Sequence, residues 1–277
     1  MSNEHRLIGP GDEDYPRGLL DLEQPPPIYV VGSTFHAPAI AVVGTRRCTT
    51  YGRNLAHGFG LALARAGWIT VSGMARGIDA AAHRGAMASP GPGVAVLGSG
   101  IDVIYPHDNE DIYRALAGGM GAVVSEYPPG IPPDRWRFPA RNRLIAAIAS
   151  AVVVVEAGER GGALITARLG SELGRPVFAV PGDVDRPASV GCNRLLRDGA
   201  FPVLGARDLI AELELILGPV PISAPVGSDA VIQSDGETID QLVERWDCET
   251  SEALARITRL ELDGRVRRVG DRVVPIQ

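Results

Sequence analysis

The chain has 277 residues, 45% of them hydrophobic, which is enough for one large domain with a sizeable core and a small second domain. All 27 basic residues are arginine, so chemistries that need a P-loop lysine, a Schiff-base lysine or a lysine general base are excluded. The net charge is −6, and the longest apolar run, residues 144–155, is shorter than the roughly 20 residues that cross a bilayer, so we expect no membrane span.

The first 38 residues are expected to form an N-terminal arm. They begin with a polar and acidic stretch that lacks the charged-then-apolar pattern of a secretory signal, which favours a cytoplasmic protein. Within the arm, residues 28–32 (IYVVG) follow three prolines. They either pair as an antiparallel strand or cover the domain, and the sequence leaves both possibilities open.

Residues 39–218 are predicted to form a doubly wound, Rossmann-like α/β domain with a mostly parallel sheet. Short runs of β-forming residues alternate there with amphipathic helical stretches, at intervals of roughly 25 to 30 residues. Such apolar runs suit strands that are buried on both faces. The expected strands are 39–43, 68–72, 94–98, 122–126, 151–156 and 176–180, with a seventh, 201–204, at a sheet edge.

A linker and a small domain are predicted to follow. Residues 219–236 are rich in proline, glycine and serine without helical periodicity, which is typical of an interdomain linker. Residues 237–277 show two stretches of helical periodicity joined by a short turn at 247–250, then a ribbon that alternates around Gly270. This order predicts a winged helix-turn-helix domain. Its partner, duplex DNA or a protein, stays open, although its acidity favours a protein contact.

Charge is distributed unevenly along the chain. Residues 208–277 hold 7 arginines and 14 acids, and residues 1–23 have a net charge of −4. Residues 24–207 hold 18 arginines and 13 acids, a net charge of +5. The middle of the chain is therefore compatible with binding a polyanion, while the tail would repel one.

The loop after the first strand of the domain is predicted to bind a phosphate. Gly44, Thr45, Arg46 and Arg47 form a tight turn before a helix, where backbone N–H groups and guanidinium groups hold anions well. The turn lacks the GxGxxG pattern, and no acid ends the second strand to bind a ribose, so no dinucleotide cofactor is expected. The three widely separated cysteines give neither a metal-ligand spacing nor a disulfide framework, so no metal is expected.

The loop after the second strand is expected to face the same crevice. Ser72 and Gly73 begin a sharp turn, and Arg76 stands within reach of the crevice. Asp79 and His83 are four residues apart on one predicted helix face, where they can form an ordering pair. An acid-base dyad at these two positions is disfavoured, because no nucleophile or metal-ligand set accompanies it.

Residues 135–143 carry the densest signal for nucleic acid. Their arginines are interleaved with Trp136 and Phe138, which combines phosphate contacts with flat surfaces that stack on bases. The alternative is a solvated basic face with its aromatic side chains in the core. The candidate binding residues of this segment are Arg135, Phe138, Arg141, Asn142 and Arg143.

The loop after the fifth strand places two further glycines at a helix N-terminus. Gly161, Gly162 and Ala163 are there candidates for a phosphate site. In the next loop, Asn193 and Arg194 look structural, but they could extend the groove.

Several motifs, in this order, together resemble the DNA processing protein A (DprA, or Smf) family. The motifs are VVGTRR, VSGMARGIDAAAHRGA, VLGSGIDVIYP, SEYPPG, FPARNRLIAA, GALITARLGSELGRPVFAVPG and GCNRLLRDGA, and they cover about residues 39–205. The C-terminal domain resembles the winged-helix domain that many members carry. Gly162 stands where many members have a serine.

The resemblance implies an extended Rossmann domain that binds single-stranded DNA without catalysis. It also implies a homodimer formed through that domain, and recruitment of the recombinase RecA onto the strand during natural transformation of competent bacteria. Carried over to this sequence, the DNA pocket would include Arg46, Arg47, Ser72, Gly73, Arg76, Arg135, Phe138, Arg141, Asn142 and residues 161–163, with Phe138 stacking on a base.

Two other functions compete with this interpretation. Nucleotide phosphoribohydrolases also use a Gly-Gly loop on a Rossmann sheet, and residues 159–166 distantly echo their PGGxGT signature, without its proline. The protein could also be mainly a scaffold whose acidic C-terminal domain is the working surface. Base release from nucleoside monophosphates would indicate the first alternative, and loss of partner binding on deletion of residues 219–277 would indicate the second.

Overall fold

A computed structural model describes residues 5–89, 91–220, 232, 236–246, 250–262, 266–270 and 272–275. The chain divides into two compact units, Met1–Pro221 and Ile222–Gln277, and each is described by itself. Most of the predicted linker, residues 219–236, lies outside the described residues, as does most of the predicted turn at 247–250.

The first unit is built on a nine-stranded sheet in the order β1-β2-β6-β5-β4-β3-β7-β8-β9. From β6 to β9 all neighbouring strands are parallel, whereas β1 and β2 pair antiparallel at one edge. The strands are β1 (Arg6–Ile8), β2 (Ile28–Gly32), β3 (Ala39–Val43), β4 (Ile69–Ser72), β5 (Gly93–Val96), β6 (Gly121–Ser125), β7 (Ala149–Val154), β8 (Val177–Ala179) and β9 (Phe201–Pro202).

The doubly wound, mostly parallel sheet that the sequence predicts is confirmed. The structure also decides the open question about residues 28–32, because β2 pairs antiparallel with β6. The segment expected as an N-terminal arm therefore adds two strands to the sheet. The seventh expected strand is short and lies at the opposite edge, as β9.

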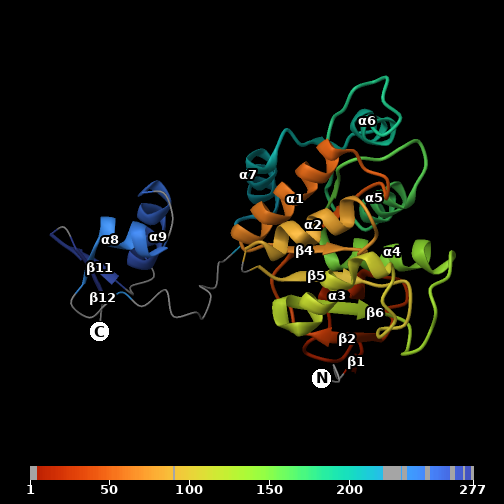
Figure 1. Cartoon of the computed structure of the whole chain (residues 1–277), viewed down its shortest axis with the longest axis horizontal. Helices are drawn as coiled ribbons and strands as arrows, with labels where there is room; N and C mark the ends of the chain where they lie inside the picture. The colour runs from red at the N-terminus through yellow and green to blue at the C-terminus, as the bar shows by residue number, and fades with distance from the viewer. Residues whose placement is uncertain are drawn as a thin grey trace. The chain divides into compact units, whose positions relative to one another are not determined.

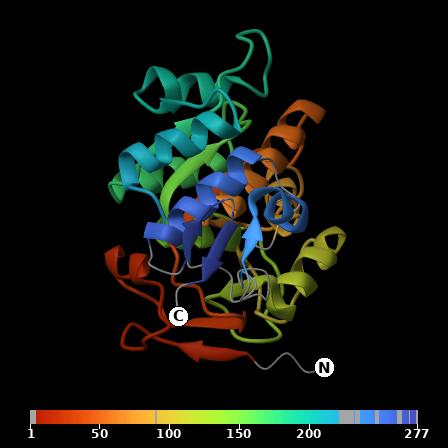
Figure 2. The same cartoon turned by 90° about the vertical axis from the view of Figure 1, so that its left-hand side faces the viewer.

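Helices cover both faces of this sheet. They are α1 (Thr50–Arg65), α2 (Ile78–Met87), α3 (Glu110–Ala115), α4 (Arg137–Ile148), α5 (Gly162–Glu172), α6 (Val190–Arg197) and α7 (Ala206–Leu217), with short helical turns η1 (Arg17–Asp21), η2 (His107–Asn109) and η3 (Leu116–Met120). Figure 1 shows α1 and α2 side by side over one face, and Figure 2 shows the same layers from the side.

The two faces follow from the two-residue period of the strands. In β3, Ile40 and Val42 pack with α1, α2 and α7, whereas Ala39, Ala41 and Val43 pack with α4 and α5 on the other face. All five side chains are buried, because a central strand with helices on both sides leaves neither face to water. The core is therefore two apolar layers on either side of one sheet.

The order in which strands are added to the sheet reverses between the neighbours β3 and β7: β4, β5 and β6 follow on one side, and β8 and β9 on the other. After β3 the chain continues into α1 on one face, and after β7 it continues into α5 on the other. The loops at the carboxyl ends of these two strands therefore diverge and leave a crevice between them. Ligands of open α/β sheets bind at such a point.

The second unit is small. It contains α8 (Ile239–Trp246), α9 (Thr250–Leu262) and a three-stranded sheet in the order β10-β12-β11, from Glu237–Thr238, Arg272–Pro275 and Val266–Val269. Leu242, Ile257 and Val273 are buried in its core. Two helices followed by an antiparallel hairpin match the predicted winged-helix domain, and β10 is an addition that the sequence did not predict.

Candidate nucleic-acid interface

A pocket of about 1000 Å³ occupies the crevice at the carboxyl ends of β3 and β7. The loop after β3, the start of α4 and the loop from β7 into α5 all line it. It brings together most of the predicted site residues, namely Gly44, Thr45, Arg46, Arg47, Arg135, Phe138, Arg141, Asn142, Gly161, Gly162 and Ala163.

The first of these loops is fixed by Glu156, at the end of the neighbouring strand. The Glu156 carboxylate accepts hydrogen bonds from the backbone N–H of Thr49, at 2.9 Å, and from the Thr49 hydroxyl. Thr49 in turn caps α1 by accepting a bond from Gly52 N, and a side chain at Gly52 would collide with Glu156. Glu156 is 7% exposed, so it holds the loop rather than a ligand. The sequence prediction did not identify this role.

The floor of the pocket is formed by Asp79 and Arg141. Arg141 is only 4% exposed, and its Nη1 donates hydrogen bonds to the carbonyl oxygens of Gly73, at 2.9 Å, and Val96. Burial lowers the pKa of Arg141 to about 10, although Asp79 opposes this shift. Burial likewise raises the pKa of Asp79, against the effect of Arg141. The floor thus holds two buried groups of opposite charge, each hydrogen-bonded to the backbone.

The predicted pairing of Asp79 with His83 is wrong. Asp79 Oδ2 instead accepts hydrogen bonds from the backbone N–H groups of Gly73, at 3.1 Å, and Ala75, at 3.4 Å. A side chain at Gly73 would collide with the Arg141 guanidinium, so this glycine makes room for the floor. His83 is fully buried in α2, and burial lowers its pKa to about 4, with Arg141 and Arg84 adding to the shift.

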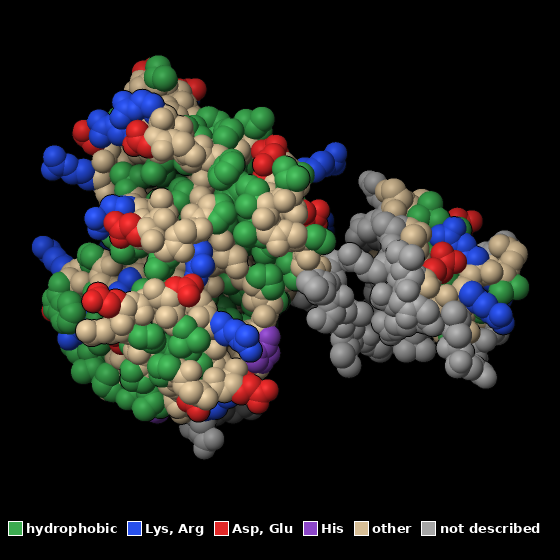
Figure 3. Space-filling model, turned by 180° about the vertical axis from the view of Figure 1, so that it is seen from behind, with side chains coloured by type: hydrophobic (Ala, Val, Ile, Leu, Met, Phe, Trp, Pro, Cys, Tyr) green, Lys and Arg blue, Asp and Glu red, His purple; other side chains and the backbone are tan. Residues whose placement is uncertain are grey.

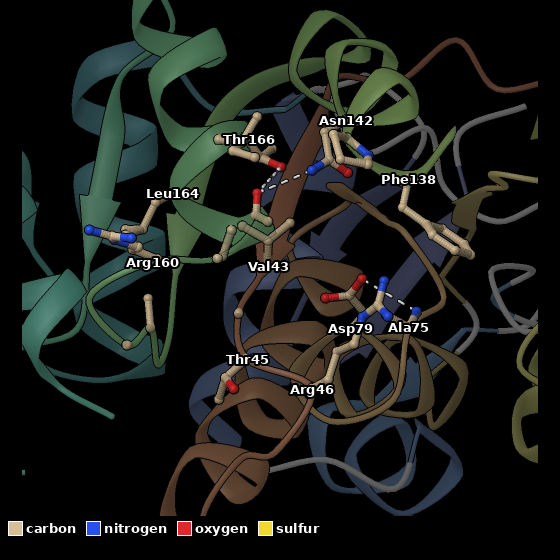
Figure 4. A pocket seen from close by; sticks show the side chains of 18 of the residues that line it. Val43, Thr45, Arg46, Ala75, Asp79, Phe138, Asn142, Arg160, Leu164 and Thr166 are labelled. Carbon is tan, nitrogen blue, oxygen red and sulfur yellow. Dashed lines mark hydrogen bonds between the residues drawn. The ribbon is translucent and has the colours of Figure 1, made fainter. Parts of the chain in front are cut away.

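The rim of the pocket is formed by Arg46, Arg47, Arg135, Phe138 and Arg160. The guanidinium carbon of Arg46 lies 5.0 Å from the centre of the Phe138 ring, and the Tyr105 ring packs against the same ring at a tilt of 32°, with 5.5 Å between the centroids. The four rim arginines are exposed, and no carboxylate of the described residues is within ion-pair distance of them. Figure 4 shows Arg46 and Phe138 on one side of the opening and Arg160 on the other.

The N-terminus of α5 completes the pocket. The Gly162 carbonyl oxygen accepts hydrogen bonds from Asn142 Nδ2 and Thr166 Oγ1, each at 3.1 Å (Figure 4). These bonds fix the first turn of the helix, whose N–H groups have no partner within the helix and attract anions. Asn142 is therefore a positioning residue for this turn.

Four predicted residues do not line the pocket. Ser72 is buried and its hydroxyl donates to Val42 O at 2.7 Å, and Gly73 lies beneath Arg141. Arg143 turns away and pairs with Glu126, while Arg76 pairs with Asp108 at 2.7 Å in a neighbouring hollow. Trp136, 58% exposed, packs against Arg137 outside the pocket.

Some residues that the prediction did not assign to the site also line the pocket, and three of them have aromatic or basic side chains. These three are Tyr105, Arg160 and Arg168. Arg160 adjoins the predicted glycines, so its charge beside a helix N-terminus could have identified it. Tyr105 comes from a distant loop after β5, and no sequence pattern connects it to Phe138.

Charge elsewhere on the first unit is mixed. On the face seen in Figure 3, acidic and basic side chains are interspersed with apolar ones. No helix in the described part of the chain is long and apolar enough to span a membrane. A group of three or more His, Cys, Asp or Glu side chains that could hold a metal ion is likewise not found among the residues described.

Comparison with known families gives two matches along the chain. Residues 6–214 match the DNA recombination-mediator protein A family, and residues 230–272 match the DprA winged helix domain. Protein Smf of Escherichia coli is 35% identical over 279 residues, covering 94% of this chain and 74% of that protein. Protein Smf of Synechocystis is 40% identical over 224 residues, and the chain spans only 55% of its length.

Two solved structures share the fold. The X-ray structure of DNA processing protein A from Streptococcus pneumoniae is 37% identical with a TM-score of 0.70, covering 76% of this chain and 74% of that one. DNA processing protein A from Helicobacter pylori is 29% identical with a TM-score of 0.69, covering 76% and 96%, and its structure concerns a single-stranded DNA binding mode.

Proposed function

Because the chain belongs to the DNA recombination-mediator protein A family, we propose that it binds single-stranded DNA in the pocket at the carboxyl ends of β3 and β7. The observation that carries this proposal is the rim, where exposed arginines that have no acidic partner among the described residues line the opening together with the Phe138 ring. The Helicobacter relative, whose structure concerns single-stranded DNA, supports the choice of ligand.

The geometry supports binding of the phosphates and of the bases by different residues of the pocket. Guanidinium groups of Arg46, Arg135 and Arg160 make charge-assisted hydrogen bonds to successive phosphates, and the first turn of α5 donates backbone N–H groups to another. Phe138 stacks on a base, which any base can satisfy because each has a flat face. Binding should therefore depend steeply on salt and little on sequence.

We propose no catalytic step. Of the described residues, Asp79 and Glu159 are the carboxylates that line the pocket. Asp79 accepts hydrogen bonds from two backbone N–H groups beside Arg141, and Glu159 pairs with Arg194 at 3.0 Å. Both carboxylates already have partners within the protein, which argues against the phosphoribohydrolase alternative.

Because of its family membership, we also propose a cellular role for this DNA binding. The strand would be held in the cytoplasm during natural transformation, protected by the bound protein and passed to RecA, with a homodimer presenting two pockets to one strand. The relatives' names, DNA processing protein and recombination mediator, support this role.

The test is fluorescence-anisotropy titration of a labelled poly-dT strand and its duplex counterpart. Wild type should prefer the single strand, and Arg46→Ala/Arg135→Ala should bind it at least about tenfold more weakly, because two charge-assisted contacts are lost. The matched control, Arg114→Ala/Arg197→Ala, removes two arginines that pair with acids away from the pocket and should stay within about twofold. Absence of single-strand binding by wild type would overturn the assignment.

A further inference from the structure

A second hollow, of about 590 Å³, lies beside the pocket over α1 and α2. Arg46 and Arg47 line both cavities, so the two share one wall. The rest of its basic lining comes from Arg53 and His57 of α1, from Arg84 of α2, and from the loop between β4 and α2, which supplies Arg76. We call it the arginine hollow.

The lining of the arginine hollow carries a large excess of positive charge. It contains five arginines, whereas Asp108 is the one carboxylate among its described lining residues. Arg76 pairs with Asp108, and Arg84 is held by Asp111 at 3.0 Å, which fixes both guanidinium groups in place. Arg53 and Arg47 are exposed and meet no carboxylate within ion-pair distance in the described part of the chain.

The chemistry of this lining fits phosphate rather than bases. No aromatic ring of Phe, Tyr or Trp is among its described lining residues, so it offers no stacking surface like Phe138. Guanidinium groups and the amide of Asn54 are instead donors that match phosphate oxygens.

We propose that the arginine hollow is a second phosphate-binding site, which takes the backbone of the same DNA strand where it leaves the pocket across Arg46 and Arg47. This inference rests on the proposed function of the pocket. The shared wall makes the two cavities one continuous basic surface, so a strand that fills the pocket reaches the hollow only when it is long enough. The hollow lengthens the binding site without reading sequence.

The experiment compares two strand lengths at physiological salt, where screening limits charge effects to about 8 Å. Oligo-dT of roughly 4 and roughly 16 nucleotides spans the range of sites known for single-strand binders. Arg53→Glu places an acid in the hollow without touching the pocket lining. Affinity for the long strand should fall about tenfold, while affinity for the short strand should change less than about twofold.

The matched control is Arg65→Glu, which makes the same charge change on an exposed arginine in the last turn of the same helix, outside both cavities. It should leave both lengths within about twofold. Equal losses on both lengths with Arg53→Glu, or no loss on either, would overturn the second site. If Arg46→Ala/Arg135→Ala still weakens both lengths in that case, the pocket stands and the hollow alone is refuted.

Discussion

The floor and the rim of the pocket use the same residue type in opposite ways. Arg141, in the floor, is 4% exposed and donates hydrogen bonds from Nη1 to the carbonyl oxygens of Gly73 and Val96. Arg46, in the rim, is exposed, and its guanidinium group lies over the face of the Phe138 ring. Burial and available partners, rather than residue type, therefore decide whether an arginine holds the fold or a ligand.

Removing the floor arginine should destabilise the protein more than any other change proposed below. Arg141→Ala leaves the buried carbonyl oxygens of Gly73 and Val96 without this donor, at about 1 to 3 kcal/mol each, and removes the positive charge near Asp79, so the free energy of unfolding should fall by about 3 to 5 kcal/mol. Urea unfolding followed by circular dichroism measures this.

The matched change in the rim is Arg135→Ala. Arg135 is exposed and has no ion-pair partner among the described residues, so its loss should alter the free energy of unfolding by less than about 0.5 kcal/mol. Similar destabilisation by both variants would contradict the claim that the floor arginine stabilises the fold and the rim arginine does not.

The second effect is a loss of folding stability at acidic pH, caused by the buried His83. The pKa of His83 is about 4 in the folded protein, because burial and the nearby Arg141 and Arg84 disfavour its charged form. In the unfolded chain an ordinary histidine has a pKa of 6.5, so between these values the unfolded state binds more protons. Stability should therefore fall as the pH drops from about 6.5 to about 4, by up to about 3 kcal/mol.

The variant that isolates this effect is His83→Leu. It fills the buried position with an apolar side chain of similar size that cannot titrate. Its free energy of unfolding should vary less between pH 6.5 and pH 4 than that of wild type, whatever the change in absolute stability. An unchanged slope in His83→Leu would contradict the prediction.

The sequence predicted the sheet and the loops that form the pocket well, because both follow from periodicity. Strand runs of Val, Ile and Ala specify a buried parallel sheet, and its carboxyl-end loops must meet at one edge. Gly44, Arg46, Phe138 and Gly162, which the sequence assigns to these loops and to the segment before them, all line the pocket.

Side-chain direction was not predictable from the same patterns. Residues 135–143 read as one basic segment, but α4 begins at Arg137, and a helix turns successive side chains by about 100°. Arg135 therefore stays at the opening while Arg141 turns inward to Gly73 and Arg143 turns away to Glu126. Partners supplied by distant strands decide which arginine remains free, and spacing alone does not reveal them.

A third effect tests the rim without disturbing the floor. Phe138→Ala removes the ring that contacts Arg46 and Tyr105, and loss of one stacked base should weaken single-strand binding by about 1 to 3 kcal/mol, roughly 5- to 150-fold. The dependence of affinity on salt should stay unchanged, because no phosphate contact is lost.

Phe138→Leu is the control for packing. Phe138 lies against Gly98, and leucine keeps an apolar contact there without a flat face. It should bind DNA almost as weakly as the alanine variant while unfolding more like wild type. Recovery of wild-type affinity in Phe138→Leu would show that packing, rather than stacking, is what the ring contributes.

The smallest expected effect is a gain at the N-terminus of α5. A β-carbon at Gly162 would have Asn142 Nδ2 as its nearest neighbour, at 3.4 Å, so a small side chain fits with little adjustment. Gly162→Ser adds a hydroxyl donor where the helix already attracts an anion, and affinity for single-stranded DNA should rise about two- to fivefold. Gly162→Ala is the control for helix propensity. Alanine and serine both favour the helix more than glycine does, but only serine has a hydroxyl that can donate to a phosphate. Equal affinity of the two variants would mean that no phosphate lies against this turn, which would limit the rim to its arginines and Phe138.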